Sequence, residues 1–287
     1  MPRLLLAVLL LLLSAAAQAE PKHFLWRVTK DSETLYLAGS VHVLRPADYP
    51  LPEVMEDAFK SSAGLVEEID LRHFDAESAQ LQMQQQGSYP SGQSLKTALP
   101  PAVYQRVAEL AARQKVDMAM IEPMRPWLAS IVLLDNQLGR EGFDPKSGVD
   151  IHFSDEADAA GKPVIGLEQA AYQLGLFAKL PDRVQQDLLV QSLDESTTLR
   201  QELDELIGAW HDGNTQVLEK ELKQEFGGYP EVYQAVLVQR NRAWMPQLEK
   251  LMQGGKPYFV VVGALHLVGP DGLLAFFKKD GYEIEQL

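Results

Sequence analysis

The sequence predicts an α/β or α+β domain in which a mixed sheet brackets a large helical middle region. Two charge-free runs rich in β-branched and aromatic residues, at residues 34–41 and 258–263, have the composition of strands buried on both faces. Between them, apolar residues recur over long stretches at helical spacing. Strands at both ends, helices between them and the lack of a linker-like segment indicate a single domain.

The chain begins with a segment typical of a secretory signal. Residues 1–3 include one arginine, residues 4–13 are almost entirely apolar, and Ala-Gln-Ala at 17–19 fits a small-x-small cleavage site. The apolar run is too short to span a bilayer comfortably. We therefore expect residues 1–19 to be removed and residues 20–287 to form one periplasmic or secreted domain. Without cysteine, the chain has neither a disulfide framework nor a lipid-anchored cysteine, so no stable membrane anchor is expected after cleavage.

The predicted elements alternate at both ends of the chain and are helical between them. A polar turn between the first two strands is typical of a hairpin. Strands are predicted at residues 23–29, 34–41, 63–70, 164–168, 258–263 and 281–287. The main helical portions cover about 75–160 and 181–253, with shorter helices at 52–61 and 273–279.

The charge balance excludes one class of partner. With 26 basic against 40 acidic residues, the formal net charge is −14. Nucleic acids require a basic surface, so the sequence argues against nucleic acid as a partner. Acidity is compatible with a metal site, because carboxylates attract divalent ions. The alternative interpretation is that the acidic charge only keeps the protein soluble.

Two Gly-x-x-His motifs follow the two apolar runs. Gly39 precedes His42 and Gly263 precedes His266, each just past a predicted strand. In open α/β sheets, ligands and catalysis are placed at such strand ends. The glycines let the chain turn sharply. We therefore expect two imidazoles at one edge of the sheet.

Imidazole and carboxylate side chains are common ligands of zinc, manganese, iron and cobalt. Two histidines and one glutamate, with a position left open for water, form a frequent catalytic set. His42, Glu68 and His266 are the candidate ligands here. No His-Glu-x-x-His or Cys-x-x-Cys motif accompanies them. The alternative interpretation is that each histidine is a core or turn residue bonded to backbone. The other histidines lack this context and are expected to be structural or at the surface: His23, His73, His152 and His211.

Several other polar residues are candidates for the same site. Glu67, Glu68 and Asp70 end one predicted strand, and Glu168 ends another. A carboxylate near a metal acts as ligand, general base or both, whereas Glu168 alternatively accepts hydrogen bonds at a helix N-terminus. Arg240 is either a surface residue or a group that stabilises an oxyanion. Nucleophilic serine catalysis is disfavoured, because the chain has no Gly-x-Ser-x-Gly elbow.

These motifs together resemble the TraB/GumN family, and the resemblance extends over nearly all of residues 20–287. This family is related to the Tiki metalloproteases and more distantly to erythromycin esterases and ChaN-type haem-iron proteins. The matching segments are residues 39–42, 66–70, 124–127, 148–150, 162–168, 240–241, 263–266 and 269–272.

The resemblance implies that the two histidines and an acidic residue bind a divalent metal. In Tiki proteins the metal is associated with manganese or cobalt and with peptide hydrolysis. The Glu-x-Asp part of the family's strand falls on Glu68 and Asp70, which favours Glu68 over Glu67.

We therefore predict an exported, metal-dependent hydrolase, peptidase-like, acting on a peptide or small-molecule substrate. His42 and His266 would hold a Mn, Co, Fe or Zn ion, with Glu68 as third ligand or base. Glu168, Asp150 or Arg240 would orient the substrate or stabilise the developing oxyanion. The alternative is a non-catalytic periplasmic protein that binds or sequesters a metal, haem or a peptide.

Overall fold

The computed structural model describes residues 21–287, so the expected signal peptide at 1–19 lies outside the described residues. It confirms the predicted mixed sheet with a large helical region. The six strands of the sheet lie in the order β4-β3-β5-β2-β1-β6. They are β1 (Leu25–Lys30), β2 (Glu33–Ser40), β3 (Leu65–Glu67), β4 (Val164–Gly166), β5 (Tyr258–Gly263) and β6 (Glu283–Gln286).

The four strands from β4 to β2 are parallel, and β1 and β6 complete the sheet in antiparallel pairs. β5 lies between β3 and β2 and is buried over residues 259–262. The register pairs Ser40 with Gly263, so β2 and β5 end side by side. Carboxyl ends of parallel strands meet at one edge, and both Gly-x-x-His motifs are therefore located there.

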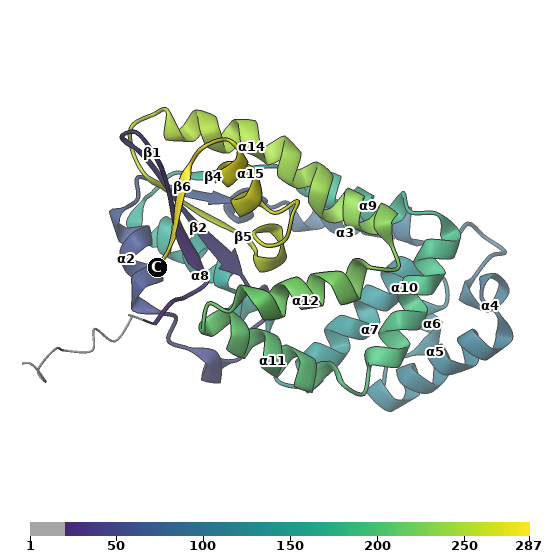
Figure 1. The fold of residues 1–287 in the computed structure, drawn as a ribbon. Coiled ribbons are helices and arrows are strands. Elements are labelled where there is room, and N and C mark those ends of the chain that lie inside the picture. Colours follow the sequence, from purple (N-terminus) through teal and green to yellow (C-terminus); the bar gives the residue numbers. More distant parts are fainter. Residues whose placement is uncertain (1–20) are drawn as a thin grey trace, which may run out of the picture.

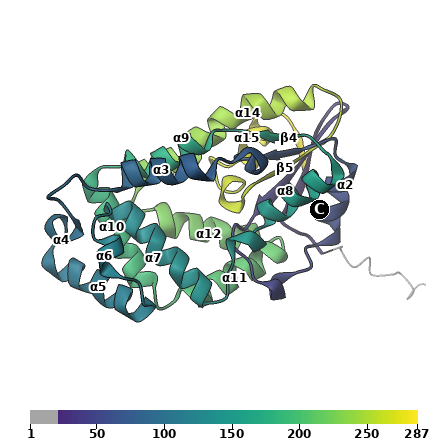
Figure 2. The same cartoon turned by 180° about the vertical axis from the view of Figure 1, so that it is seen from behind.

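Helices cover both faces of the sheet (Figures 1 and 2). On one face lie α2 (Glu53–Ser61) and α8 (Val149–Ala160), and on the other α14 (Gln239–Met252) and α15 (Leu273–Lys279). The largest hydrophobic cluster joins the sheet to these helices through fully buried rings such as Phe59, Phe153, Phe259 and Phe277. Burying one such side chain contributes about 1.5–3 kcal/mol.

The remaining helices form a lobe beside the sheet, on the right of Figure 1. A hydrophobic cluster of its own holds part of this lobe together, including Leu110, Ile121, Leu133 and Leu189. The helices are α3 (Ala76–Gly87), α4 (Leu95–Ala98), α5 (Pro101–Gln114), α6 (Met118–Ile121), α7 (Pro126–Arg140), α9 (Ala170–Ala178), α10 (Asp182–Glu195), α11 (Leu199–His211), α12 (Thr215–Phe226) and α13 (Pro230–Tyr233). In residues 21–287 none of the helices has the length and apolarity needed to cross a membrane.

Short helical turns connect these elements. The 3₁₀ turns are η1 (Pro46–Asp48), η2 (Leu71–His73), η3 (Pro145–Ser147) and η5 (Ala264–His266). A π-helical turn, η4 (Gln234–Val238), directly precedes α14. π-Helical turns are rare in proteins, and those that occur are often found at functional sites. Here η4 places the Val236 carbonyl where the Arg240 side chain donates to it.

One contact ties the helical lobe to the sheet at the edge that carries the histidines. Trp210, at the end of α11, is buried, and its indole N–H donates to the Gly39 carbonyl over 2.6 Å. Gly39 itself has no room for a side chain, because an added Cβ would come within 2.4 Å of the Phe24 ring. The glycine of the first Gly-x-x-His motif thus lets the Phe24 ring pack directly against the backbone of β2.

Candidate functional site

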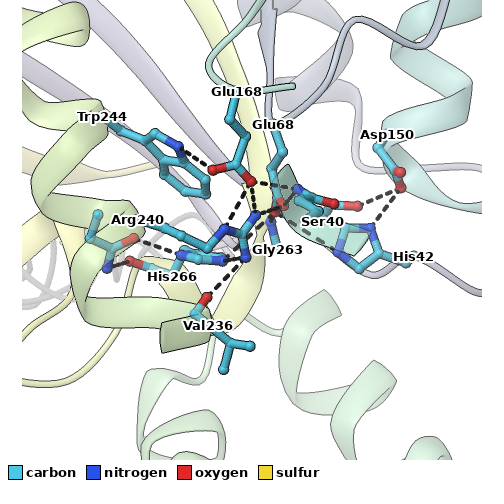
Figure 3. Close-up of polar contacts among 12 residues, drawn as sticks. Ser40, His42, Glu68, Asp150, Glu168, Val236, Arg240, Trp244, Gly263 and His266 are labelled. Carbon is cyan, nitrogen blue, oxygen red and sulfur yellow. Dashed lines mark hydrogen bonds and ion pairs between the residues drawn. The ribbon is translucent and has the colours of Figure 1, made fainter. Parts of the chain in front are cut away.

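The structure brings His42, Glu68 and His266 together at the carboxyl edge of the sheet (Figure 3). Glu68 follows β3 directly, and its Oε1 accepts a hydrogen bond from the Gly263 N–H over 2.7 Å. The same oxygen lies 4.0 Å from His42 Nε2 and 3.9 Å from His266 Nε2. Both imidazoles therefore present the same ring nitrogen to one carboxylate oxygen.

His42 is oriented by a carboxylate behind it. Its Nδ1 lies 3.2 Å from Asp150 Oδ1, and that oxygen also accepts the Ser40 hydroxyl over 2.8 Å. Asp150 reaches this position because Gly148, at the start of α8, packs against the His42 carbonyl, where an added Cβ would lie 2.6 Å away. Burial by surrounding groups opposes protonation of His42, but Asp150 outweighs it and raises the pKa to about 9, although 57% of the side chain is open to solvent.

The tautomer of His266 is determined by Asn241. The Asn241 amide donates to the carbonyls of His266 and Asp271, over 3.1 Å and 2.8 Å, which fixes its orientation. Its Oδ1 is then left to accept from His266 Nδ1 over 2.6 Å. The lone pair of His266 is therefore on Nε2, where it accepts from Arg240 Nη1 over 2.9 Å. Burial, aided by Arg240, lowers the pKa of His266 to about 3, so the ring is neutral.

Arg240 lies at the centre of a buried polar network. Its Nη2 contacts Glu68 Oε2 and lies 2.6 Å from Glu168 Oε1, and its Nε donates to Glu168 over 2.9 Å. Gln173 donates to both carboxylates, over 2.9 Å and 2.7 Å. The indole N–H of Trp244 donates to the other Glu168 oxygen over 3.2 Å. Arg240 is only 7% exposed, so the interpretation of it as a surface residue is wrong.

The charges around Glu68 keep it ionised. Burial alone would raise its pKa, but His266, Arg240 and His42 together lower the pKa to about 2. Because His266 is itself neutral, the permanent charge of Arg240 is the main physical cause. The carboxylate is therefore available as a ligand or a base throughout the physiological range.

The other acidic and histidine candidates lie outside this cluster. Glu67 is 2% exposed and accepts the Leu71 N–H, and Asp70 pairs with the His73 ring over 2.8 Å. His152 pairs with Glu56 over 2.7 Å. The site also contains residues that the sequence did not single out as members: Ser40, Gln173 and Trp244.

The comparisons with known proteins place the chain in a family. The family model that matches the chain is described as the TraB/PrgY/gumN family, and it covers residues 24–286. The chain belongs to this family. Two relatives, from Escherichia coli strain K12 and Shigella flexneri, both carry the description "Uncharacterized protein YbaP". Each is 26% identical over 238 residues, which is 83% of this chain and 85% of the relative. No solved structure matches the chain.

A cavity of about 640 Å³ opens beside the cluster in this TraB/PrgY/gumN family member. One end is formed by the strand-edge residues His42, Glu68, Gly263 and His266, together with Arg240. The rest of its wall comes from helices of the lobe and from η4. Clefts of about 300–1,000 Å³ are the usual size of small-molecule sites.

The donor atoms at this end of the cavity are of the types that bind divalent ions. Both Nε2 atoms face Glu68 Oε1, and an added Cβ on Gly263 would lie 3.1 Å from His42 Nε2 and 3.3 Å from Glu68 Oε1. A side chain on Gly263 would therefore crowd both of these atoms. Each Nδ1 has an acceptor behind it, the usual support for a ligating histidine.

The surrounding charge also suits a divalent ion. The carboxylates of Glu68, Asp150 and Glu168, with the Arg240 guanidinium, carry a formal charge of minus two. The pKa of about 9 keeps a proton on His42 at neutral pH, and an incoming ion would have to displace that proton.

The same donors are spaced more widely than in a formed metal centre. No group of three His, Cys, Asp or Glu side chains within residues 21–287 already has metal-binding geometry. In a tetrahedral zinc site two ligand atoms lie about 3.4 Å apart, against 4.0 Å between His42 Nε2 and Glu68 Oε1. Bringing these two atoms to that separation needs a movement of about half an ångström. It also requires Arg240 Nη1 to release the His266 lone pair.

Proposed function

We propose that this chain is an exported, metal-dependent hydrolase, with His42, Glu68 and His266 as the residues that hold a divalent ion. The observation that supports this most strongly is the pairing of the two rings. Each Nδ1 is held by an acceptor, and each Nε2 faces the same Glu68 oxygen at 3.9–4.0 Å. Imidazole and carboxylate in this arrangement leave room for substrate on the cavity side.

If bound there, a divalent ion would make water more acidic and so provide a nucleophile near neutral pH. The protein residues have separate roles. Asp150 keeps the His42 ring oriented, and Asn241 keeps the His266 proton on Nδ1. Glu68 is the third ligand or the base. Its pKa of about 2 keeps the carboxylate ionised, which suits a ligand better than a general base.

Arg240 and Glu168 would position Glu68 and respond to charge in the substrate. Glu168 accepts from Nε of Arg240, which fixes the guanidinium plane. Nη1 of Arg240 donates to Val236 and to His266 Nε2. Once the His266 lone pair is used elsewhere, one Nη1 hydrogen is free to donate to an oxygen that gains negative charge. Removing a donor of this kind costs about 10²–10³ in turnover in other hydrolases.

The test is hydrolysis of a peptide and amide library with Mn²⁺, Co²⁺, Fe²⁺ or Zn²⁺ supplied in turn. Glu68→Gln should lower turnover at least about 100-fold. Glu156→Gln, an exposed carboxylate on α8, is the matched control and should retain it. A wild-type protein that binds the ion but turns over no substrate would refute the hydrolase and favour a binding or sequestering role.

A further inference from the structure

We propose that the cavity beside the site takes the hydrocarbon chain of an acylated substrate, whose amide or ester bond lies at His42, Glu68 and His266. The proposal rests on the hydrolase function above and names its substrate class. In the reaction, the oxygen of water joins the acyl carbon and the bond from that carbon to nitrogen or oxygen breaks. The amine or alcohol leaves with a proton of the water, and the fatty acid is the other product.

The wall of the cavity is aliphatic and aromatic over most of its surface. α7, α9, α11 and η4 contribute apolar side chains to it, among them Trp127, Ile131, Phe177, Leu206, Trp210 and Val236. Ile131 and Leu134 are 38% and 41% exposed, although both are large and apolar. Exposed apolar side chains are usually scattered singly. Here two of them, one turn apart, line the same cavity.

Polar groups are concentrated at the end of the cavity that faces the sheet. Elsewhere in the wall, Ser130 and Ser192 donate their hydroxyl hydrogens to carbonyls of their own helices, both over 2.8 Å. Gln191 on α10 and Glu221 and Glu225 on α12 also border the cavity. All three have partners within the protein, and Glu225 is exposed to solvent. The cavity is therefore largely apolar, and its charged catalytic candidates lie together at the end that faces the sheet, which matches an amphiphile.

A hydrocarbon chain suits this chamber better than a peptide does. Each peptide residue brings one N–H and one C=O, and each of these groups needs a partner when it is buried. The wall consists largely of helices, whose backbone groups are bonded internally and offer no strand edge. A saturated chain has no such requirement, and each methylene gains from leaving water.

The experiment measures binding of neutral N-acyl glycinamides by calorimetry, with hexanoyl, octanoyl and decanoyl chains below their aggregation limit. Each added methylene should tighten binding about fourfold. The series is measured on wild type and on metal-free His42→Ala, so that binding is read without turnover. A capped apolar hexapeptide is the competing ligand.

Variants locate the chain in the cavity. Ile131→Glu and Leu134→Glu place a charge in the wall at positions that are already partly exposed, and each should weaken decanoyl binding at least about tenfold. Met120→Glu is the matched control, because Met120 is 52% exposed and does not line the cavity. Circular dichroism and thermal unfolding establish that each variant is folded.

Affinity that is independent of chain length would overturn the proposal. So would hexapeptide binding tighter than decanoyl binding, or equal losses in Ile131→Glu and Met120→Glu. The two proposals fail separately. If wild type itself binds no metal but still shows the chain-length series, the hydrolase is overturned and the acyl site is supported. A flat series in a protein that does bind metal overturns the acyl site alone.

Discussion

Replacing Glu67 by glutamine should stabilise the protein at neutral pH. Glu67 ends β3 but faces the core, where it is 2% exposed. Its Oε1 has no hydrogen-bond partner among the described residues, and its Oε2 accepts the Leu71 N–H at 3.4 Å. The Leu71 N–H and the Ser154 hydroxyl both favour the ionised carboxylate, but burial outweighs them. Burial raises the pKa of this carboxyl from 4.5 to about 8. The folded protein therefore holds Glu67 protonated under conditions where the unfolded chain ionises it.

The size of the effect follows from the two pKa values. A raised pKa gives stability that is complete below pH 4.5 and is lost as the pH rises towards 8. At pH 7 the folded protein has lost about 3 kcal/mol of this stability, because each pKa unit is worth about 1.4 kcal/mol. At pH 5 the loss is below about 1 kcal/mol. Glutamine is neutral at every pH and nearly isosteric, so it removes the dependence.

The assay is urea unfolding of wild type and Glu67→Gln at pH 5, 6, 7 and 8. The free-energy difference between the two proteins should favour the variant increasingly from pH 5 to pH 8. Glu156→Gln on the exposed face of α8 is the control and should show no trend. A difference that is constant with pH, or a variant that is less stable than wild type at pH 8, would refute this reasoning.

Three further substitutions test the site. Gly263→Ala places a Cβ 3.1 Å from His42 Nε2, so metal affinity measured by calorimetry should fall at least about tenfold with the circular dichroism spectrum unchanged. Asn241→Leu removes the acceptor at His266 Nδ1, and the same titration should show a loss of about 10–100-fold. Arg240→Met removes the cation shared by two buried carboxylates and should cost about 3–5 kcal/mol in urea unfolding. Arg242→Met, at an exposed position, should cost little. Equal effects would contradict the network.

The sequence predicted the parts of the fold that are encoded locally. Charge-free runs become β2 and β5, and the last predicted strand becomes β6 (Glu283–Gln286). The two Gly-x-x-His motifs could be placed at one edge because neighbouring parallel strands end together. The register, which pairs Ser40 with Gly263, agrees with this placement. The expected strand at residues 63–70 is shorter, because the sheet pairs only Leu65–Glu67.

The rest of the site depends on contacts between distant segments. Arg240 lies on a helix that a sequence pattern shows only as amphipathic, and its contacts with Glu68 and Glu168 depend on how α14 packs over the sheet. Gln173 lies in the short helix after β4, and no sequence motif marked it as a site residue. The cavity is formed between helices of the lobe, so no single segment encodes it.

The most direct measurement of the central proposal is metal content. The untagged protein is exposed to Mn²⁺, Co²⁺, Fe²⁺ and Zn²⁺, freed of excess ion and measured by elemental mass spectrometry beside His42→Ala, His266→Ala and His211→Ala. We expect about one ion per chain in wild type and in His211→Ala, whose ring lies outside the site, and none in the other two variants. A folded wild type without bound ion, or an ion retained in both His42→Ala and His266→Ala, would contradict the proposed metal site.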